Sequence, residues 1–504
     1  MTGLQRKDFY LLAFLFLVVL LIFFPLFYTD YIYTDEAVQL WLYWPGSDFS
    51  MFAAQGRWIT ELLIAKSFKA INTIHGITYI RIFGLAMWLV CLPVWYTIVK
   101  RIAARGPGYE YLPFFTCLYL VTSLQFSITV QWASCIELPI ANTAGLLSGA
   151  ILYLAIRDNE KKWSLPVPAG LGAAVAGLVS LSTYQSGFGC FLVPFLFHYI
   201  SAYTTRKEVV FVKGLAFYFL MYAVYFVLFK VWVTVNHVAS DPRTGFTAEP
   251  FDKLLFFFSH PLKRAFWFNI IIDGDNKLGR AAYKVLLVGW MLLAFIRFGK
   301  AKWLSAIKYI VAVLLVFMIS YLPSLVVKES YSSNRTLLAI NMCVWIVCAE
   351  MVLYIVKSIQ LRRIVAFSVA TVLLISGWYN FNRQFLKPIH EEYMAVKNHV
   401  QQHYNKNITT VYFIKPTEDA FSRKHHLQIS MDEFGVPSTF FEWVPEPLMQ
   451  QMVAEITGDR QTGQKLTVKF WPDKESFTQS GEAITNKVLV LNVPELIDPK
   501  ISAH

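Results

Sequence analysis

Long apolar runs separated by short polar loops fill the first three quarters of the chain. The first run, residues 9–28, is about 20 residues long, which is enough to cross a hydrocarbon core of roughly 30 Å. The same criterion of length and apolar content predicts about eleven membrane-spanning helices, and therefore an all-α polytopic bundle. Their predicted ranges are 9–28, 77–99, 111–130, 138–156, 165–183, 187–203, 214–235, 283–297, 304–325, 337–357 and 364–381.

Two loops, 29–76 and 236–282, are much longer than the others. Inside them, residues 51–71 and 251–272 have apolar positions at helical spacing with charged residues among them, and the second stretch is interrupted near Pro261. This pattern is typical of amphipathic helices that lie in the membrane interface. We expect the two helices to flank a cavity on the face of the membrane that both loops share.

The composition changes at about His390, where the long apolar runs end. The pattern predicts helices over 390–404 and 445–457, and short strands over 411–415, 466–470 and 487–493. A stretch of this length suffices for one small domain. We therefore expect a transmembrane domain over residues 1–385 and a small soluble α/β domain over residues 386–504.

The composition excludes a soluble enzyme. Of 504 residues, 56% are hydrophobic and only 15% are charged, with a mean hydropathy of +0.47, whereas soluble domains carry about 25% charged residues. The net charge of +12 raises the question of nucleic-acid binding. The basic residues fall mostly in short loops between apolar runs, so we expect no nucleic-acid partner and interpret the charge as a signal of membrane topology.

Six clusters of basic residues lie on alternate loops, so all six fall on one side of the membrane. By the positive-inside rule that side is cytoplasmic. The N-terminus is then cytoplasmic, the first run is a retained anchor, and both long loops and the C-terminal domain are extracytoplasmic. The clusters are Arg6/Lys7, Lys100/Arg101/Arg105, Arg157/Lys161/Lys162, Arg206/Lys207/Lys213, Arg297/Lys300/Lys302 and Lys357/Arg362/Arg363.

The cysteines and the common nucleotide motifs give no signal. All six cysteines lie in or at the ends of apolar runs, where Cys behaves as a small apolar residue. Their spacing predicts neither a disulfide framework nor a metal site. No Walker motif and no GxGxxG occurs, so nucleotide hydrolysis is not supported.

The acidic pair Asp35–Glu36 follows directly after the first predicted span. Charges at a bilayer edge are costly unless they are solvated, paired or used. A carboxylate in a partly desolvated pocket has a raised pKa and is a better base. Asp35 is our candidate base, and Glu36 is a second base, a metal ligand or a ligand contact. The alternative is that both carboxylates belong to an ordinary solvated loop.

Two arginines are candidates for binding a phosphate, because the guanidinium group offers a fork of donors that matches phosphate oxygens. Arg57 lies in the first amphipathic stretch and Arg335 begins the tenth predicted span. The alternative roles are contact with lipid headgroups and anchoring at the interface. Lys328, His260 and Arg264 add positive charge in outer loops, as secondary phosphate contacts or as plain surface charge.

Further polar residues lie near the same face of the membrane. Arg81 and Glu137 fall near the outer ends of the second and fourth spans, where ionisable residues are functional candidates by default. They are equally able to pair with each other. Tyr184 and Gln185 occupy a very short turn between the fifth and sixth spans, where they can bind ligand hydroxyls or hold helices together.

These motifs together resemble a known family. The acidic pair after the first span, the Gly56-Arg57-Trp58 motif and the sequence S-T-Y-Q-S-G over 182–187 are similar to those of bacterial Gtr-type glucosyltransferases. Those proteins belong to the GT-C glycosyltransferase superfamily and decorate O-antigen or related surface glycans. The resemblance covers roughly residues 5–385. Asp35–Glu36 replaces the Asp-Asp type of pair expected in the family.

The resemblance implies a periplasmic-face enzyme of the bacterial inner membrane. Its donor would be a polyprenyl-phosphate sugar such as undecaprenyl-phosphate glucose, and its acceptor a hydroxyl of a lipid-linked or surface glycan. Asp35 would act as the base, with the role of Glu36 undecided, and we expect no required cofactor, with a divalent metal beside this pair as the alternative. The donor phosphate would be held by Arg57 and Arg335, with Lys328, His260 and Arg264 as further contacts, and the sugar or acceptor by Tyr184, Gln185, Glu137 and Arg81.

Three other functions fit parts of the pattern. A flippase or transporter of lipid-linked glycans usually shows repeated halves and spans broken near the midplane, neither of which the sequence indicates. An O-antigen polymerase or ligase would work at the same face, but we expect it to carry a large mid-chain loop rich in Arg and His, which residues 236–282 match only in part. A sensor with an outer ligand-binding domain needs far fewer spans.

Overall fold

The computed structural model describes residues 4–103, 109–157, 166–201, 207–238, 245–268, 277–299 and 302–498. Parts of the predicted basic clusters and of the second long loop therefore lie outside the described residues, as does the end of the chain. These are Arg105, Lys161, Lys162, Arg206 and Lys300, residues 239–244 and 269–276, and residues 499–504.

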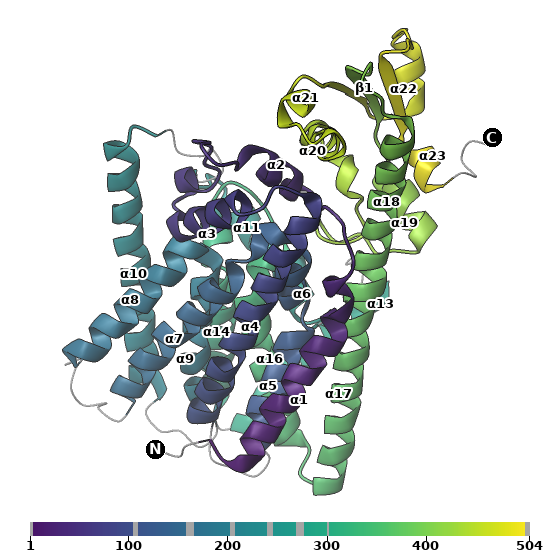
Figure 1. The fold of residues 1–504 in the computed structure, drawn as a ribbon. Helices are drawn as coiled ribbons and strands as arrows, with labels where there is room; N and C mark the ends of the chain where they lie inside the picture. Colours follow the sequence, from purple (N-terminus) through teal and green to yellow (C-terminus); the bar gives the residue numbers. More distant parts are fainter. Residues whose placement is uncertain are drawn as a thin grey trace.

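Residues 6–381 form a helical bundle, with the N-terminus near the end that lies away from the C-terminal residues (Figure 1). Its longer helices are α1 (Arg6–Phe23), α4 (Ile74–Ile102), α7 (Leu138–Ile156), α8 (Val167–Thr183), α10 (Lys207–Val235), α13 (Lys277–Phe298), α14 (Trp303–Ser320), α16 (Asn334–Ile355) and α17 (Ile359–Phe381). Its shorter helices are α2 (Asp35–Leu42), α3 (Trp58–Lys69), α5 (Leu112–Thr122), α6 (Leu124–Gln131), α9 (Leu192–Ile200), α11 (Pro250–Ser259), α12 (Pro261–Ala265) and α15 (Leu322–Val326). Single turns of 3₁₀-helix occur at η1 (Phe24–Phe27), η2 (Ala53–Gln55), η3 (Tyr109–Tyr111) and η4 (Ala133–Cys135), and a longer one at η5 (Gln185–Phe191).

Eight helices in the described part of the chain are long and apolar enough to cross a membrane, or nine if the bent pair α5–α6 counts as one span. They are α1 with η1, α4, α7 with η4, α10, α13, α14, α16, and α17 with α18. The expected all-helical bundle is therefore present, whereas the count of eleven stays a prediction. The difference lies in three of the predicted ranges, 111–130, 165–183 and 187–203.

Each of these three ranges forms a shorter or broken helix. The helix over 111–130 bends by 46° at Ser123, which is extended and caps the next helix by accepting a hydrogen bond from the Phe126 N–H at 3.1 Å. The run at 165–183 yields the 17-residue helix α8, and the run at 187–203 is split between η5 and the nine-residue helix α9.

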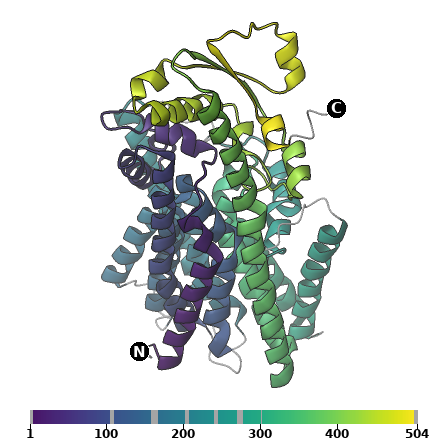
Figure 2. The ribbon, with the colours of Figure 1, turned by 45° about the vertical axis from the view of Figure 1, so that its right-hand side comes forward.

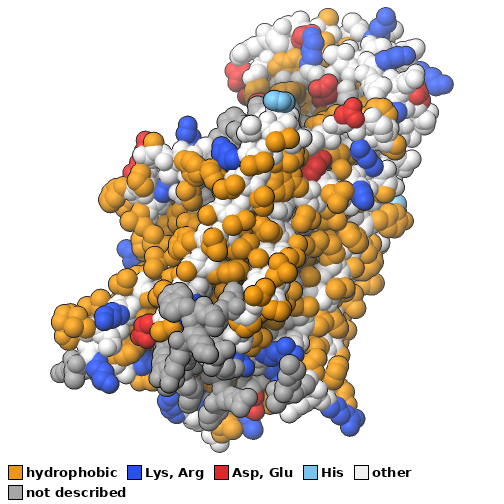
Figure 3. All heavy atoms as spheres, turned by 90° about the vertical axis from the view of Figure 1, so that its left-hand side faces the viewer, with side chains coloured by type: hydrophobic (Ala, Val, Ile, Leu, Met, Phe, Trp, Pro, Cys, Tyr) orange, Lys and Arg blue, Asp and Glu red, His pale blue; other side chains and the backbone are white. Residues whose placement is uncertain are grey.

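The flank of the bundle exposes large apolar side chains. Examples are Val90, Val285 and Phe367, which are 74%, 69% and 75% exposed. Figure 3 shows hydrophobic side chains over much of one flank, with many of the Lys and Arg side chains nearer the two ends. Soluble proteins rarely expose such a continuous apolar surface, so the bundle is that of a membrane protein.

Two glycines let η5 approach α7 closely. A β-carbon at Gly145 or Gly149 would collide with the backbone carbonyl of Gly187 or Phe191, respectively. Small residues four apart on one helix face are a common means of close helix packing in membranes. This contact fixes the start of α7, which Glu137 directly precedes, beside the turn that carries Tyr184 and Gln185.

The chain leaves the bundle through a continuous rod. α17 passes through a π-helical segment (Asn382–Leu386) into α18 (Lys387–His403), and the whole run Ile359–His403 is helical over 45 residues. Figure 2 shows the rod rising from the bundle into the C-terminal residues. We call residues 387–498 the C-terminal part, and the end of the bundle beneath it the capped end.

The C-terminal part contains a three-stranded parallel sheet in the order β2-β1-β3. Its strands lie where the sequence predicted them, as do helices α18 and α20. Its elements after α18 are β1 (Thr410–Ile414), α19 (Glu418–His425), η9 (Ser438–Phe440), α20 (Pro445–Thr457), α21 (Arg460–Gln464), β2 (Thr467–Trp471), α22 (Lys474–Gln479), β3 (Val488–Asn492) and α23 (Val493–Ile497).

The C-terminal part is fastened to the first long loop of the bundle. The Arg460 guanidinium lies over the Trp41 ring at 3.9 Å. Glu455 accepts a hydrogen bond from the backbone N–H of Ile74 at 2.7 Å, and Gln451 donates to the carbonyl of Asn72 at 2.9 Å. The two predicted amphipathic stretches are helical, as α3 and as α11 and α12, and the expected break occurs at Pro261.

Candidate active site

Five predicted site residues gather at the capped end from five separate segments of the chain. They are Asp35, Arg57, Glu137, Tyr184 and Arg335, which we call the site cluster. The charges of Arg57 and Arg335 act together on both the Glu137 carboxyl and the Tyr184 hydroxyl. The fold therefore brings together arginines that are far apart in the sequence.

Asp35 lies at the start of α2, behind a strained residue. Thr34 has φ 42° and ψ −115°, a conformation that side-chain-bearing residues rarely adopt and that often marks functional sites. Its N–H donates to Ser438 Oγ of the C-terminal part at 2.9 Å. The Asp35 side chain is half-buried and lies within electrostatic range of Cys135, two residues before Glu137.

Glu36 is fully buried and its carboxylate is occupied by structural partners. It forms an ion pair with Arg81, itself fully buried, and accepts backbone N–H groups from Tyr33 at 2.7 Å and Ala133 at 2.6 Å. Burial raises the pKa of the Glu36 carboxyl, and the Arg81 guanidinium and these N–H donors oppose the rise. Arg81 thus pairs with Glu36, and the alternative pairing of Arg81 with Glu137 does not occur.

Arg57 is held in place by neighbours that leave its charge unpaired. Gly56 before it has φ 76°, and a β-carbon there would collide with Tyr225, so glycine is required at this turn. Arg57 Nε donates to Gln185 Oε1 at 3.3 Å and its guanidinium lies over the Tyr184 ring at 4.3 Å. Among the described residues, no carboxylate forms an ion pair with it.

Arg335 carries two carboxylate partners from the C-terminal part. Its Nη2 lies 2.9 Å from Asp432 Oδ2, and its Nε lies 3.3 Å from Glu433 Oε1. It also donates to the hydroxyl of Tyr331, and its guanidinium lies over the Trp132 ring at 4.3 Å. The positive charge of Arg335 is therefore compensated by ion pairs, whereas Arg57 forms no ion pair within the part of the chain that the structure describes.

Glu137 is buried, being only 2% exposed, and its Oε2 has no hydrogen-bond partner within the described part of the chain. An unsatisfied buried oxygen is costly and calls for an explanation. Because two guanidinium groups act on this carboxylate without bonding to it, the arrangement fits a site for a ligand that donates a hydroxyl to Glu137.

Of the remaining predicted phosphate contacts, only one lies beside the site cluster by its described contacts. Arg264 donates to the carbonyl of Ser332 at 2.6 Å and to Ser430 Oγ at 3.3 Å, beside the start of α16. Lys328 and His260 have exposed side chains, and His260 stacks on Phe256. By its described contacts, Arg264 adjoins the site cluster, whereas Lys328 and His260 lie outside it.

Sequence reasoning missed two residues of the site, Asp432 and Glu433. Asp432 and Glu433 are adjacent acidic residues, as Asp35 and Glu36 are. An adjacent acidic pair was the sequence feature that made Asp35 and Glu36 candidates. That signal identifies candidate carboxylates, but it does not show which of many acidic residues in a polar segment meets Arg335. Among the described residues, no group of three or more His, Cys, Asp and Glu side chains is arranged to hold a metal ion.

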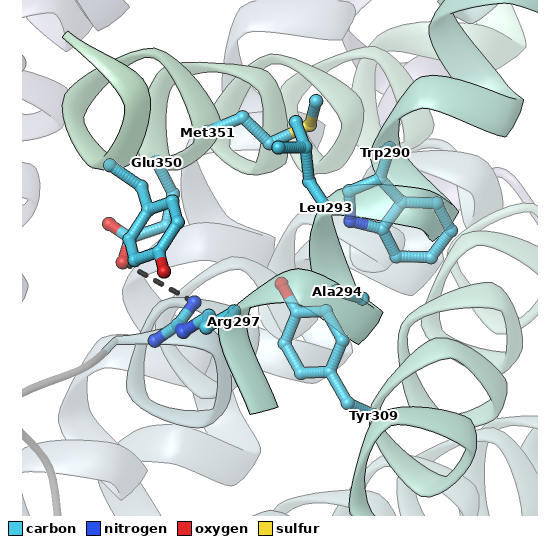
Figure 4. Close-up of a pocket in the computed structure, with 8 residues that line it drawn as sticks. Trp290, Leu293, Ala294, Arg297, Tyr309, Glu350 and Met351 are labelled. Carbon is cyan, nitrogen blue, oxygen red and sulfur yellow. Dashed lines mark ion pairs between the residues drawn. The ribbon is translucent and has the colours of Figure 1, made fainter. Parts of the chain in front are cut away.

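A small pocket lies elsewhere in the bundle, between α13, α14 and α16 (Figure 4). It is lined by aromatic residues and by the ion pair of Arg297 with Glu350, whose atoms lie 3.7 Å apart. Glu350 follows Arg335 by 15 residues on α16, which is about 22 Å along the helix. The pocket is therefore separate from the site cluster.

No family model matches the chain, and no curated protein or solved structure matches it.

Proposed function

We propose that the chain is an integral-membrane glycosyltransferase that moves a sugar, glucose in the first instance, from a polyprenyl-phosphate donor to a glycan hydroxyl. The observation that carries the proposal is the site cluster: two arginines act on one buried carboxylate with an unsatisfied oxygen, beside a half-buried carboxylate. Phosphate, sugar hydroxyls and an attacking hydroxyl require these three kinds of group.

Each residue then has a distinct role. Arg57 binds the donor phosphate, because its guanidinium is the uncompensated one of the two, and it stabilises the charge that grows as the phosphate leaves. Glu137 accepts a hydroxyl of the donor sugar in the interior, with Tyr184 and Gln185 beside it. Asp35 takes the proton of the acceptor hydroxyl, since a half-buried carboxylate is accessible to an acceptor and Glu137 is not. Arg335 supports the cluster, and the buried Glu36–Arg81 pair fixes α2 on α4.

The membrane topology completes the proposal. With the N-terminus in the cytoplasm, as the positive-inside rule favours, the capped end and the C-terminal part face the periplasm of a bacterial inner membrane. The C-terminal part is then an α/β extracytoplasmic domain.

The test is a transfer assay with the purified full chain. Radiolabelled undecaprenyl-phosphate glucose and other polyprenyl-phosphate hexoses are offered with lipid-linked glycan as acceptor. We expect label to move from the donor to the glycan. Movement of intact lipid-linked glycan across a liposome bilayer, with no donor consumed, would establish a flippase instead. Joining of glycan chains without consumption of the donor would establish a polymerase or ligase.

Replacing Arg57 tests the phosphate site directly. We expect Arg57→Gln to weaken binding of undecaprenyl phosphate about tenfold or more, because a charge-assisted hydrogen bond to phosphate is lost. Arg57→Lys should recover part of the affinity, since the charge remains but the fork of donors does not. Binding is measured in detergent by microscale thermophoresis, with Lys66→Gln, an exposed position on the helix α3 that follows Arg57, as control. Equal affinities for Arg57→Gln and the control would remove Arg57 from the site.

A further inference from the structure

A segment of the C-terminal part reaches into the capped end of the bundle beside the site cluster. We call residues 428–439 the acidic finger. At its tip Ser430 and Phe434 pair as an isolated antiparallel bridge, with the Ser430 N–H donating to the Phe434 carbonyl at 3.0 Å. Asp432 and Glu433 occupy the turn between them, so the two carboxylates are presented together.

Glu433 is completely buried and serves the first turn of α16. Its carboxylate accepts the backbone N–H groups of Asn334 at 2.8 Å and Arg335 at 3.2 Å, and it also accepts from the Asn334 amide and from Ser333 Oγ. The first N–H groups of a helix have no partner within the helix and favour a negative charge. Burial raises the pKa of the Glu433 carboxyl, and the Arg335 guanidinium opposes that rise.

The finger also contacts the other segments that carry the site cluster. The Tyr33 hydroxyl donates to the Asp432 carbonyl at 2.6 Å, next to the start of α2. The Gln131 amide donates to the Glu433 carbonyl at 3.1 Å, at the end of α6 and just before η4. The finger therefore joins the segments that precede Asp35, Glu137 and Arg335.

Both ends of the finger are held by side chains of the helical rod. At one end the Gln428 N–H donates to Gln384 of the π-helical segment at 2.9 Å. At the other, buried Glu392 of α18 accepts the N–H groups of Ser438 at 2.8 Å and Thr439 at 2.9 Å. A segment fixed at both ends and buried at its tip has the properties of a permanent wall of the site, and these contacts argue against a mobile lid.

We propose that the acidic finger is a structural component of the site, in which Asp432 and Glu433 are positioning residues that hold Arg335 and register α16 against α2. The C-terminal part thereby completes the site within the membrane bundle. The inference that Arg335 affects ligand binding rests on the proposed function. The inference that the finger holds α16 in place does not.

The first experiment measures hydrogen exchange in the full chain in detergent. Glu433→Gln keeps the size of the side chain but presents a donor where only donors surround it. We expect the amides of residues 334–336 to exchange about tenfold faster in Glu433→Gln than in the wild type. In Glu433→Asp, which keeps the charge, exchange should be slower than in Glu433→Gln. Glu442→Gln, 76% exposed in the same part of the chain, is the matched control and should leave exchange unchanged.

The second experiment is a double-mutant cycle on the binding of undecaprenyl phosphate. Asp432→Asn removes a carboxylate that holds the Arg335 guanidinium in position, so we expect binding about threefold to tenfold weaker than in the wild type. In the Arg335→Gln background the same substitution should have no effect, since a direct contact is non-additive. A merely structural loss would weaken binding equally in both backgrounds.

The outcomes separate the two proposals. If neither finger variant differs from Glu442→Gln in exchange at 334–336, the finger does not hold α16 and the inference is wrong, whatever the transfer assay gives. If exchange rises as expected but the wild type transfers no sugar, the inference about the finger is supported and the proposed activity is wrong. Additive effects in the cycle would show that Asp432 does not act through Arg335.

Discussion

Asp35→Asn is expected to lower the rate of sugar transfer by about 10²–10⁴-fold, the usual contribution of a positioned general base. Asparagine keeps the size of the side chain but accepts no proton at neutral pH. The half-buried position at the start of α2 is retained, so binding of undecaprenyl phosphate should change little. The loss should therefore appear in kcat rather than in the affinity for the donor lipid.

Three comparisons sharpen this prediction. Asp48→Asn, an exposed carboxylate in the same loop, should transfer sugar at the wild-type rate. Glu137→Gln should raise KM for the sugar donor more than it lowers kcat, because its proposed role is to bind a sugar hydroxyl. The acidic limb of the pH–rate profile, which reports ionisation of the base, should disappear in Asp35→Asn alone. A wild-type rate in that variant would mean that Asp35 is not the base.

Arg81→Gln is expected to destabilise the fold by about 3–5 kcal/mol, because it leaves the Glu36 charge buried without its partner. The pair is completely inaccessible to solvent, so no water replaces the lost guanidinium. The midpoint temperature of thermal unfolding in detergent should fall by several degrees. His75→Gln, which removes a 58%-exposed partner of Asp30 from the same helix, should change stability by less than about 1 kcal/mol.

A double variant separates charge from packing at this position. Arg81→Met combined with Glu36→Gln removes both charges together, and replacing both members of a buried pair is often close to neutral. We expect most of the stability lost in Arg81→Gln to return. If Arg81→Gln alone unfolds at the wild-type temperature, the pair does not support the fold, and Glu36 regains its place as a candidate for the chemistry.

The sequence was most informative where a physical preference is local. Apolar length predicted the bundle, and alternation within short runs predicted the strands 411–415, 466–470 and 487–493, since membrane insertion and strand formation depend on neighbouring residues. The number of spans was harder to predict, because Ser123 interrupts one apolar run and the 3₁₀-helix η5 takes up the start of another. Apolar content alone does not reveal such breaks.

The site shows the same limit. Asp35 and Glu36 are adjacent and chemically alike, yet successive residues on a helix point about 100° apart, so one is half-buried and the other faces Arg81 in the interior. The pairing of Arg335 with Asp432 spans 97 residues. Nothing local to residue 432 specifies that contact, which depends on how the whole C-terminal part is placed on the bundle.

The rod from α17 to α18 has a mechanical consequence. Because the helix is unbroken over 45 residues, the residues after His403 are joined to α17 by about 26 Å of continuous α-helix, and not by a flexible linker. Any change in the tilt of α17, such as adaptation to a thicker or thinner bilayer, is transmitted through Gln384 and Glu392 to the acidic finger. The two attachments of the acidic finger to the rod thus join the orientation of α17 in the membrane to the position of Asp432 and Glu433.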